Sequence, residues 1–191
     1  MSQSAAGSAA GGRAVHDSSR RIVAVLSISA VVAWSLALVV ATSLRVDGPP
    51  RTIALILHIP AMVLSFGAIM LVDWHGFPWL LGRRELSETI RLDGAATPLI
   101  WIGIATMLTT GAFLSPDLGN PLTVVKLVAV LVLILNGIML LPLMRRLVVM
   151  PPTTSFAGLT AGHRIHMLSC LTVSQLSWWT AIIIGFVNAE F

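Results

Sequence analysis

Five long apolar runs dominate this chain and limit what it can fold into. They cover residues 22–44, 52–72, 98–114, 121–144 and 165–188. A helix needs about 17–25 predominantly apolar residues to cross the hydrocarbon core of a bilayer. Inside that core a segment must satisfy its own backbone hydrogen bonds, which a helix does and an isolated strand does not. The sequence therefore predicts an all-α fold, a polytopic transmembrane helix bundle with five spans.

The composition agrees with a membrane protein. Hydrophobic residues make up 56% of the 191 residues and charged residues only 10%, whereas a soluble domain carries about 25% charged residues. We expect one transmembrane domain over residues 20–191. Residues 1–19 are rich in Gly, Ala and Ser and are expected to form a disordered tail. Cys170 is the single cysteine, so an intramolecular disulfide is excluded.

The arginines predict the orientation of the spans. Nine of them lie before the first run or in the connections that follow the second and fourth runs, and only Arg45 and Arg51 lie in the other two connections. Cytoplasmic loops carry the excess of basic residues in membrane proteins. We therefore expect a cytoplasmic N-terminus, an external C-terminus and residence in a cytoplasmic membrane of the bacterial type. The same rule accounts for the net charge of +4, so the charge does not indicate a nucleic-acid partner.

Two local patterns predict where helices begin. Thr97-Pro98 and Asn120-Pro121 each place a capping side chain before a proline, which suits the first position of a helix. They predict helix starts at the third and fourth runs. The stretch 80–92, with apolar residues among charges, is expected to be a short helix at the membrane surface.

Two ionisable residues inside the spans are the candidate functional residues. Lys126 is the only lysine, and it lies five residues into the fourth run. His58 lies six residues into the second run, and both runs are entered from the external side. At 1.5 Å per residue the two groups reach depths of roughly 8 and 9 Å. Intramembrane charges are costly and usually mark function, so we expect both to face the bundle interior at one level.

The chemistry of this pair suggests a cofactor or a metal. A neutral imidazole is a common ligand for haem iron and copper, and an ammonium can pair with a haem propionate or relay a proton. Lys126 is therefore both a candidate cofactor-binding residue and a candidate catalytic one. Met62 lies one turn after His58 and adds a soft thioether, which makes His58 and Met62 the candidate metal ligands. The alternative is packing, with His58 bonded to a neighbouring helix and Lys126 reaching the headgroups.

Further polar residues lie deeper and at the inner boundary. Asn136 lies ten residues after Lys126, about 80° away around the helix, and is a candidate cofactor-binding residue in the same interior sector. A second cluster of polar residues is expected at the inner boundary of the membrane. These residues either form a separate site or are simply solvated. The members of the cluster are Asp73, His75, His163 and His166.

Three motifs in order resemble a known family. Leu57-His58 begins a helix that continues to Phe66-Gly67, Thr109-Thr110-Gly111 closes the next helix, and Val125-Lys126-Leu127 begins one that runs to Asn136-Gly137. This pattern, over residues 52–146, resembles the membrane family of the copper-resistance D proteins and the HemJ-type protoporphyrinogen oxidases. The resemblance implies a small helical bundle. In the haem branch it implies a b-type haem held by His58, with Lys126 needed for activity. In the other branch it implies copper movement across the membrane.

Three functions are open at this point. The first is a haem-b-binding redox protein, an oxidoreductase that would exchange electrons with a membrane partner. The second is a component for copper handling or small-solute transport, in which His58 and Met62 bind the metal transiently. The third is a structural or assembly protein, monomeric or oligomeric, whose polar groups only join helices within the lipid bilayer.

Overall fold

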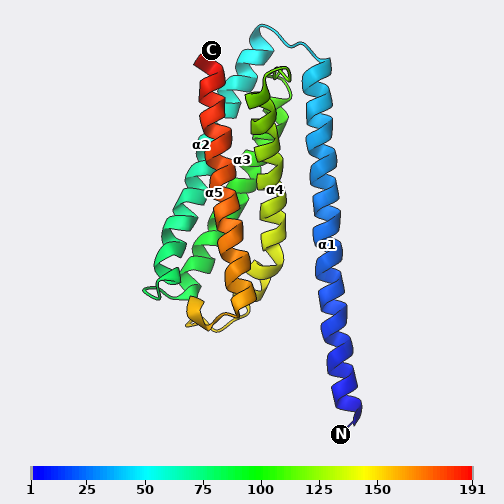
Figure 1. The fold of residues 1–191 in the computed structure, drawn as a ribbon, viewed down its shortest axis with the longest axis vertical. Helices are drawn as coiled ribbons and strands as arrows, with labels where there is room; N and C mark the ends of the chain where they lie inside the picture. The colour runs from blue at the N-terminus through cyan, green and yellow to red at the C-terminus, as the bar shows by residue number, and fades with distance from the viewer. Residues whose placement is uncertain (1, 191) are drawn as a thin grey trace.

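The part of the chain that the structure describes is mostly α-helical and contains no strand (Figure 1). This computed structural model describes the backbone of residues 2–190 and the side chains of residues 18–188. Five α-helices and one short 3-10 helix follow in order: α1 (Ser2–Ser43), α2 (Pro49–Leu80), α3 (Leu86–Gly111), α4 (Pro121–Val148), η1 (Phe156–Gly158) and α5 (Ala161–Glu190).

The predicted fold class is confirmed. All five α-helices contain a stretch that is long and apolar enough to cross a membrane, and the spanning part of α1 is Ser18–Ser43. The five spans correspond to the five apolar runs, although every helix extends beyond its run by several residues at one end or both. The expected disorder of residues 1–19 falls almost wholly outside the described side chains and stays a prediction.

The predicted start of the third span is wrong. Pro98 does not begin a helix but lies inside α3, which starts twelve residues earlier at Leu86. The stretch expected to form a separate surface helix is therefore divided between the end of α2, a turn and the first turns of α3. An interior proline removes one backbone hydrogen bond, and transmembrane helices tolerate that loss when packing holds the helix. The other predicted start is confirmed, because Asn120 caps α4 by accepting a hydrogen bond from the Leu122 amide at 2.9 Å.

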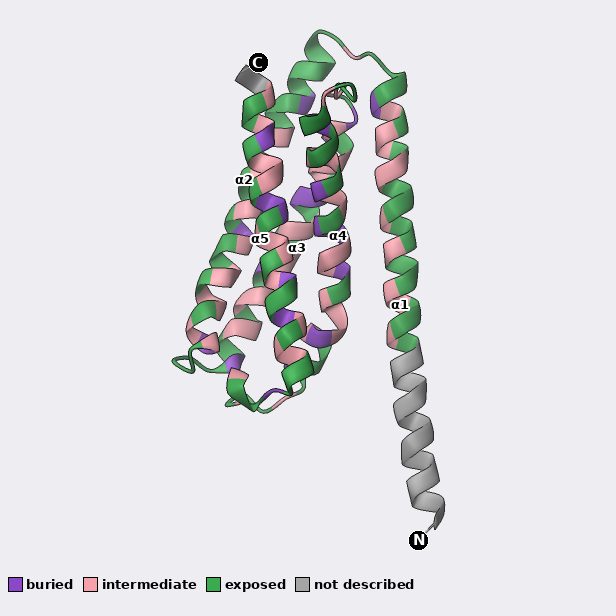
Figure 2. Cartoon of the chain, viewed as in Figure 1, coloured by how far each residue is buried: buried purple, intermediate pink, exposed green. Residues whose placement is uncertain are grey.

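The bundle is built from two antiparallel helix pairs and one added helix (Figure 1). α2 packs mainly against α3, and α4 packs mainly against α5, while fewer contacts join α3 to α4. α1 lies along α4 and is exposed or half-buried over most of its described length (Figure 2). Trp34 ties it to the bundle by donating a hydrogen bond from Nε1 to the Leu127 carbonyl at 3.2 Å.

α2 and α3 come into very close contact at one point. The Ser65 side chain is fully buried and donates a hydrogen bond to the Ile100 carbonyl at 3.0 Å. Opposite it, Gly103 has so little room that a Cβ there would overlap Ser65 Oγ and lie 2.8 Å from the Ala61 carbonyl oxygen. Small residues at helix interfaces let backbones approach in this way, so this crossing fixes the position of α3 against α2.

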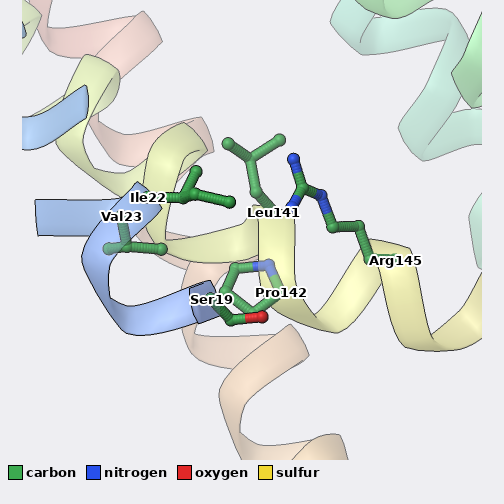
Figure 3. Close-up of a pocket in the computed structure, with 6 residues that line it drawn as sticks. All are labelled: Ser19, Ile22, Val23, Leu141, Pro142 and Arg145. Atoms are coloured by element: carbon green, nitrogen blue, oxygen red, sulfur yellow. The ribbon is translucent and has the colours of Figure 1, made fainter. Parts of the chain in front are cut away.

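Two apolar clusters fill the interior. One lies mid-bundle around Trp178, Ile134 and Ile138, and Phe66 of α2 reaches it with a ring-centroid distance of 5.7 Å to Trp178. The other lies at the end where α2 meets α3, around Trp79 and Leu147. Near that end the first spanning turns of α1 press Ile22 and Val23 against Pro142, and the crevice has no room for a water molecule (Figure 3).

The arginines collect at one end of the bundle. The α2–α3 and α4–α5 connections lie at the same end (Figure 1), and residues 81–92 and 145–164 together hold six arginines against two glutamates. We call this the arginine-rich end. By the positive-inside rule it is the predicted cytoplasmic end, which leaves His58 and Lys126 toward the opposite face.

Candidate functional site

His58 is held by the end of α3. Its Nδ1 lies 2.8 Å from Oγ1 of Thr110, a buried residue one position before the end of that helix. His58 itself is half-buried on α2, three turns into the helix. The helix pair therefore fixes the ring from both sides, since α2 supplies the imidazole and α3 supplies its hydrogen-bond partner.

The hydrogen bonds of Thr110 determine which imidazole nitrogen carries the proton. A threonine hydroxyl has one proton to donate. Thr110 Oγ1 lies 2.7 Å from the Thr106 carbonyl and 3.4 Å from the Met107 carbonyl, both of which can only accept. The hydroxyl proton is therefore used by the backbone, and Oγ1 must accept from His58. We infer that Nδ1 of His58 is protonated and that Nε2 carries the free lone pair.

Gly111 of α3 lies beside the His58 ring. A Cβ at Gly111 would lie 3.6 Å from Cε1 and 4.0 Å from Nδ1 of His58. Those distances are ordinary van der Waals contact, so Gly111 leaves space at the ring edge where a larger side chain would press on the imidazole. Thr110 and Gly111, two residues of the Thr-Thr-Gly motif, thus both act on His58.

Lys126 faces the same part of the bundle. It is half-buried on α4, six residues after the Asn120 cap. Eleven residues along α4, which is about three turns and within roughly 20° of the same direction, a Cβ at Gly137 would lie 3.2 Å from the Trp101 ring of α3. The Lys126 face of α4 is therefore the face that meets α3. The one ion pair among the described residues joins Arg84 to Glu88, so no described carboxylate pairs with Lys126.

Asn136 and Met62 are less closely tied to this site. The Asn136 side chain donates a hydrogen bond from Nδ2 to the Cys170 carbonyl at 2.8 Å, so it is turned toward α5 and joins α4 to that helix. Met62 is half-buried on α2, one turn from His58. Their roles as cofactor and metal ligands stay predictions.

Three residues of the predicted inner cluster, Asp73, His75 and His163, have separate partners. Asp73 accepts a hydrogen bond from Gln175 of α5. His75 donates within α2 to the Leu71 carbonyl at 3.2 Å, and His163 contacts Thr160 and Arg146 in hydrogen bonds of 2.9 and 3.2 Å. Over residues 18–188, no three His, Cys, Asp or Glu side chains come together as a metal site.

The structure adds one intramembrane carboxylate that the sequence analysis missed. Asp93 lies in α3, two turns after Leu86 and one turn before Thr97. The capping pattern at Thr97-Pro98 predicts a helix start there, which leaves Asp93 outside the predicted span. A signal was available, since Asp73 and Asp93 lie seven residues before and after the two ends of the α2–α3 turn and so fall at one depth.

Comparison of the chain with protein-family models, curated proteins and solved structures gives no match. The site is therefore interpreted from its own geometry.

Proposed function

We propose that this protein is an integral membrane redox protein that binds haem b through Nε2 of His58. The observation that carries the proposal is the hydrogen bond between His58 Nδ1 and Thr110 Oγ1. Histidines that ligate metals almost always donate their other ring N–H to a fixed acceptor, which sets the tautomer and the orientation of the ring. His58 has that arrangement, and its Nε2 has the lone pair that an iron would need.

The charge near His58 suits a haem more than a bare ion. Lys126 lies on the face of α4 that meets α3, the helix whose end contacts His58, and no described carboxylate pairs with it, so it is free to pair with a propionate. A haem also brings its own four ring nitrogens and needs few protein ligands. This fits the described residues, among which no three metal-binding His, Cys, Asp or Glu side chains meet. When bound, haem supplies one-electron chemistry at a potential set by its axial ligands and burial.

The residues of this chain would then have distinct tasks. His58 binds and orients, Thr110 holds Nδ1–H in place, and Gly111 leaves the ring edge unobstructed. Lys126 neutralises an acidic substituent or holds a proton at Nζ. The lipid around the spans holds little water, which strengthens each of these electrostatic interactions.

The first test is an absorption spectrum of the detergent-purified protein from cells supplied with excess haem precursor. We expect a Soret band in the wild type and none in His58→Ala. Thr110→Val keeps the shape of the side chain and removes the acceptor, so haem affinity should fall roughly 10- to 100-fold. Thr109→Val is the matched control, since the Thr109 hydroxyl is exposed and only donates to the Ala105 carbonyl at 2.8 Å.

The outcomes that would refute the proposal are specific. A colourless wild type under these conditions would refute it, as would an unchanged spectrum in His58→Ala. A colourless protein that binds Cu(I) and loses it in His58→Ala and Met62→Leu would instead select the copper-handling function. Full function in His58→Leu and Lys126→Leu would select the structural role.

Lys126 has a test of its own. In haem dimethyl ester both propionates are neutral, so an ammonium gains nothing from pairing with them. We expect the wild type to bind free haem more tightly than the ester, and Lys126→Met to bind both equally. If the wild type and Lys126→Met prefer haem over the ester by the same factor, Lys126 does not contact a propionate.

A further inference from the structure

An open groove lies at the arginine-rich end, outside the site around His58. It has a volume of about 240 Å³, which corresponds to roughly eight water molecules at liquid density. Its walls come from the first two turns of α3 and from the end of α4 with the segment that follows. The lining residues are Leu86, Ser87, Ile90, Arg91, Val148, Met150 and Pro152.

The groove lies where the membrane ends. Arg91 is five residues into α3, which is about 7–8 Å along the helix axis. Val148 closes α4, and it and Val149 are 59% and 82% exposed. Aliphatic side chains this exposed beside arginines are typical of the boundary between hydrocarbon and headgroups. The groove therefore opens toward lipid headgroups at one side and toward acyl chains at the other.

The polar side of the groove is basic. Ser87 and Arg91 are four residues apart and lie on one face of α3. Both nearby glutamates have other partners, because Glu88 pairs with Arg84 at 3.6 Å and Glu85 accepts from the Ser87 hydroxyl at 3.3 Å. Arg91 thus has no carboxylate partner among the described residues.

We propose that this groove binds one anionic phospholipid, with its phosphate on Arg91 and its glycerol and upper acyl chain against Ile90 and Val148. Charge complementarity selects the ligand, since the apolar walls fit any lipid but the free guanidinium favours a headgroup with net negative charge. Basic pockets between transmembrane helices on the cytoplasmic side bind acidic headgroups in this way. An arginine also holds two phosphate oxygens at once through its planar fork.

The experiment uses the full chain in detergent, titrated with dioleoylphosphatidylglycerol or dioleoylphosphatidylcholine and followed by native mass spectrometry. Arg91→Gln removes the charge, and Val148→Trp fills the groove without changing any charge. Two matched controls are available. Arg83→Gln removes an exposed arginine from the same end, and Val149→Trp adds the same bulk at the next residue, which does not line the groove.

We expect the wild type to bind phosphatidylglycerol more tightly than phosphatidylcholine. Arg91→Gln should weaken phosphatidylglycerol binding about fivefold, and Val148→Trp should weaken both lipids, while Arg83→Gln and Val149→Trp bind as the wild type does. Excess inorganic phosphate should not displace the lipid.

Three results would overturn the proposal. The first is unchanged phosphatidylglycerol affinity in Arg91→Gln or Val148→Trp. The second is displacement of the lipid by inorganic phosphate, which would make the groove a site for free anions. The third is loss of a dimer in Val148→Trp with lipid affinity unchanged, which would assign the groove to contact between copies of the chain.

Discussion

Replacing Gly103 with alanine should loosen the contact on which the α2–α3 pair depends. A Cβ at this position would lie 2.8 Å from the Ala61 carbonyl oxygen, whereas ordinary contact begins at 3.4 Å. The two backbones must therefore separate by about 0.6 Å, because a helix carbonyl cannot rotate away. The Ser65 hydroxyl overlaps the same Cβ, so it must also leave the Ile100 carbonyl to which it donates at 3.0 Å.

The expected cost follows from three contributions. Overpacking of this kind costs about 1–3 kcal/mol. The lost interhelical hydrogen bond adds about 0.6 kcal/mol, the average measured between membrane helices. Alanine recovers up to about 1 kcal/mol through its higher helix propensity. Gly103→Ala should therefore lower the free energy of unfolding by about 2 kcal/mol.

The assay is reversible unfolding in mixed micelles with increasing dodecyl sulfate, followed by circular dichroism. Gly94→Ala is the matched control, because Gly94 lies in the same helix and a Cβ there would meet nothing within 4 Å. We expect this control to be no less stable than the wild type.

Equal stability of Gly103→Ala and Gly94→Ala would refute the packing argument. The double variant Ser65→Ala with Gly103→Ala removes the hydroxyl overlap but leaves the Ala61 carbonyl in place. It should therefore recover only part of the loss. Complete recovery would show that the hydroxyl alone causes the strain, contrary to the backbone contact proposed here.

Two other helix contacts give predictions for the same unfolding assay. Asn136→Leu removes the hydrogen bond to the Cys170 carbonyl and should lower the free energy of unfolding by about 0.6 kcal/mol, and by no more than about 1.7 kcal/mol. A larger loss of stability, or loss of the Soret band without loss of stability, would point to a role beyond joining α4 to α5. Gln175→Leu takes away the donor to Asp73 and the acceptor for Trp179 Nε1, so it should lower the free energy of unfolding by about 1.5–3 kcal/mol. Adding Asp73→Asn should recover part of this stability, and no recovery would contradict a role for the carboxylate.

The candidate site could be located from sequence but not assembled from it. Depth within a span follows from counting residues at a fixed rise, which is why His58 and Lys126 were expected near one level. Their surroundings depend on helix rotation and on the neighbour each helix chooses. The sequence placed Thr110 only in a motif that closes a helix, whereas in the structure its hydroxyl oxygen lies 2.8 Å from Nδ1 of His58. Asn136 was expected in the same sector, and its amide turns to α5 instead.

The α2–α3 turn shows the same limit at the level of helix ends. A proline after a capping residue predicted a helix start at Pro98, but packing at Leu86 and Trp79 holds α3 together for twelve residues before it. The preference of a capping residue and a proline for a helix start is worth a few kcal/mol at most, and the burial of large apolar side chains exceeds it. Asp93 therefore lies within the third spanning helix.

The chain itself determined the number of spans, their approximate limits and the clustering of arginines at one end. These follow from apolar length and charge, which act on each segment separately because every helix satisfies its own backbone in lipid. Only the tertiary structure decided which helices pair, which way each side chain faces and where a groove remains between α3 and α4. Those features depend on close contacts such as Ser65 against Gly103, where tenths of an ångström decide the arrangement and no single segment contains the information.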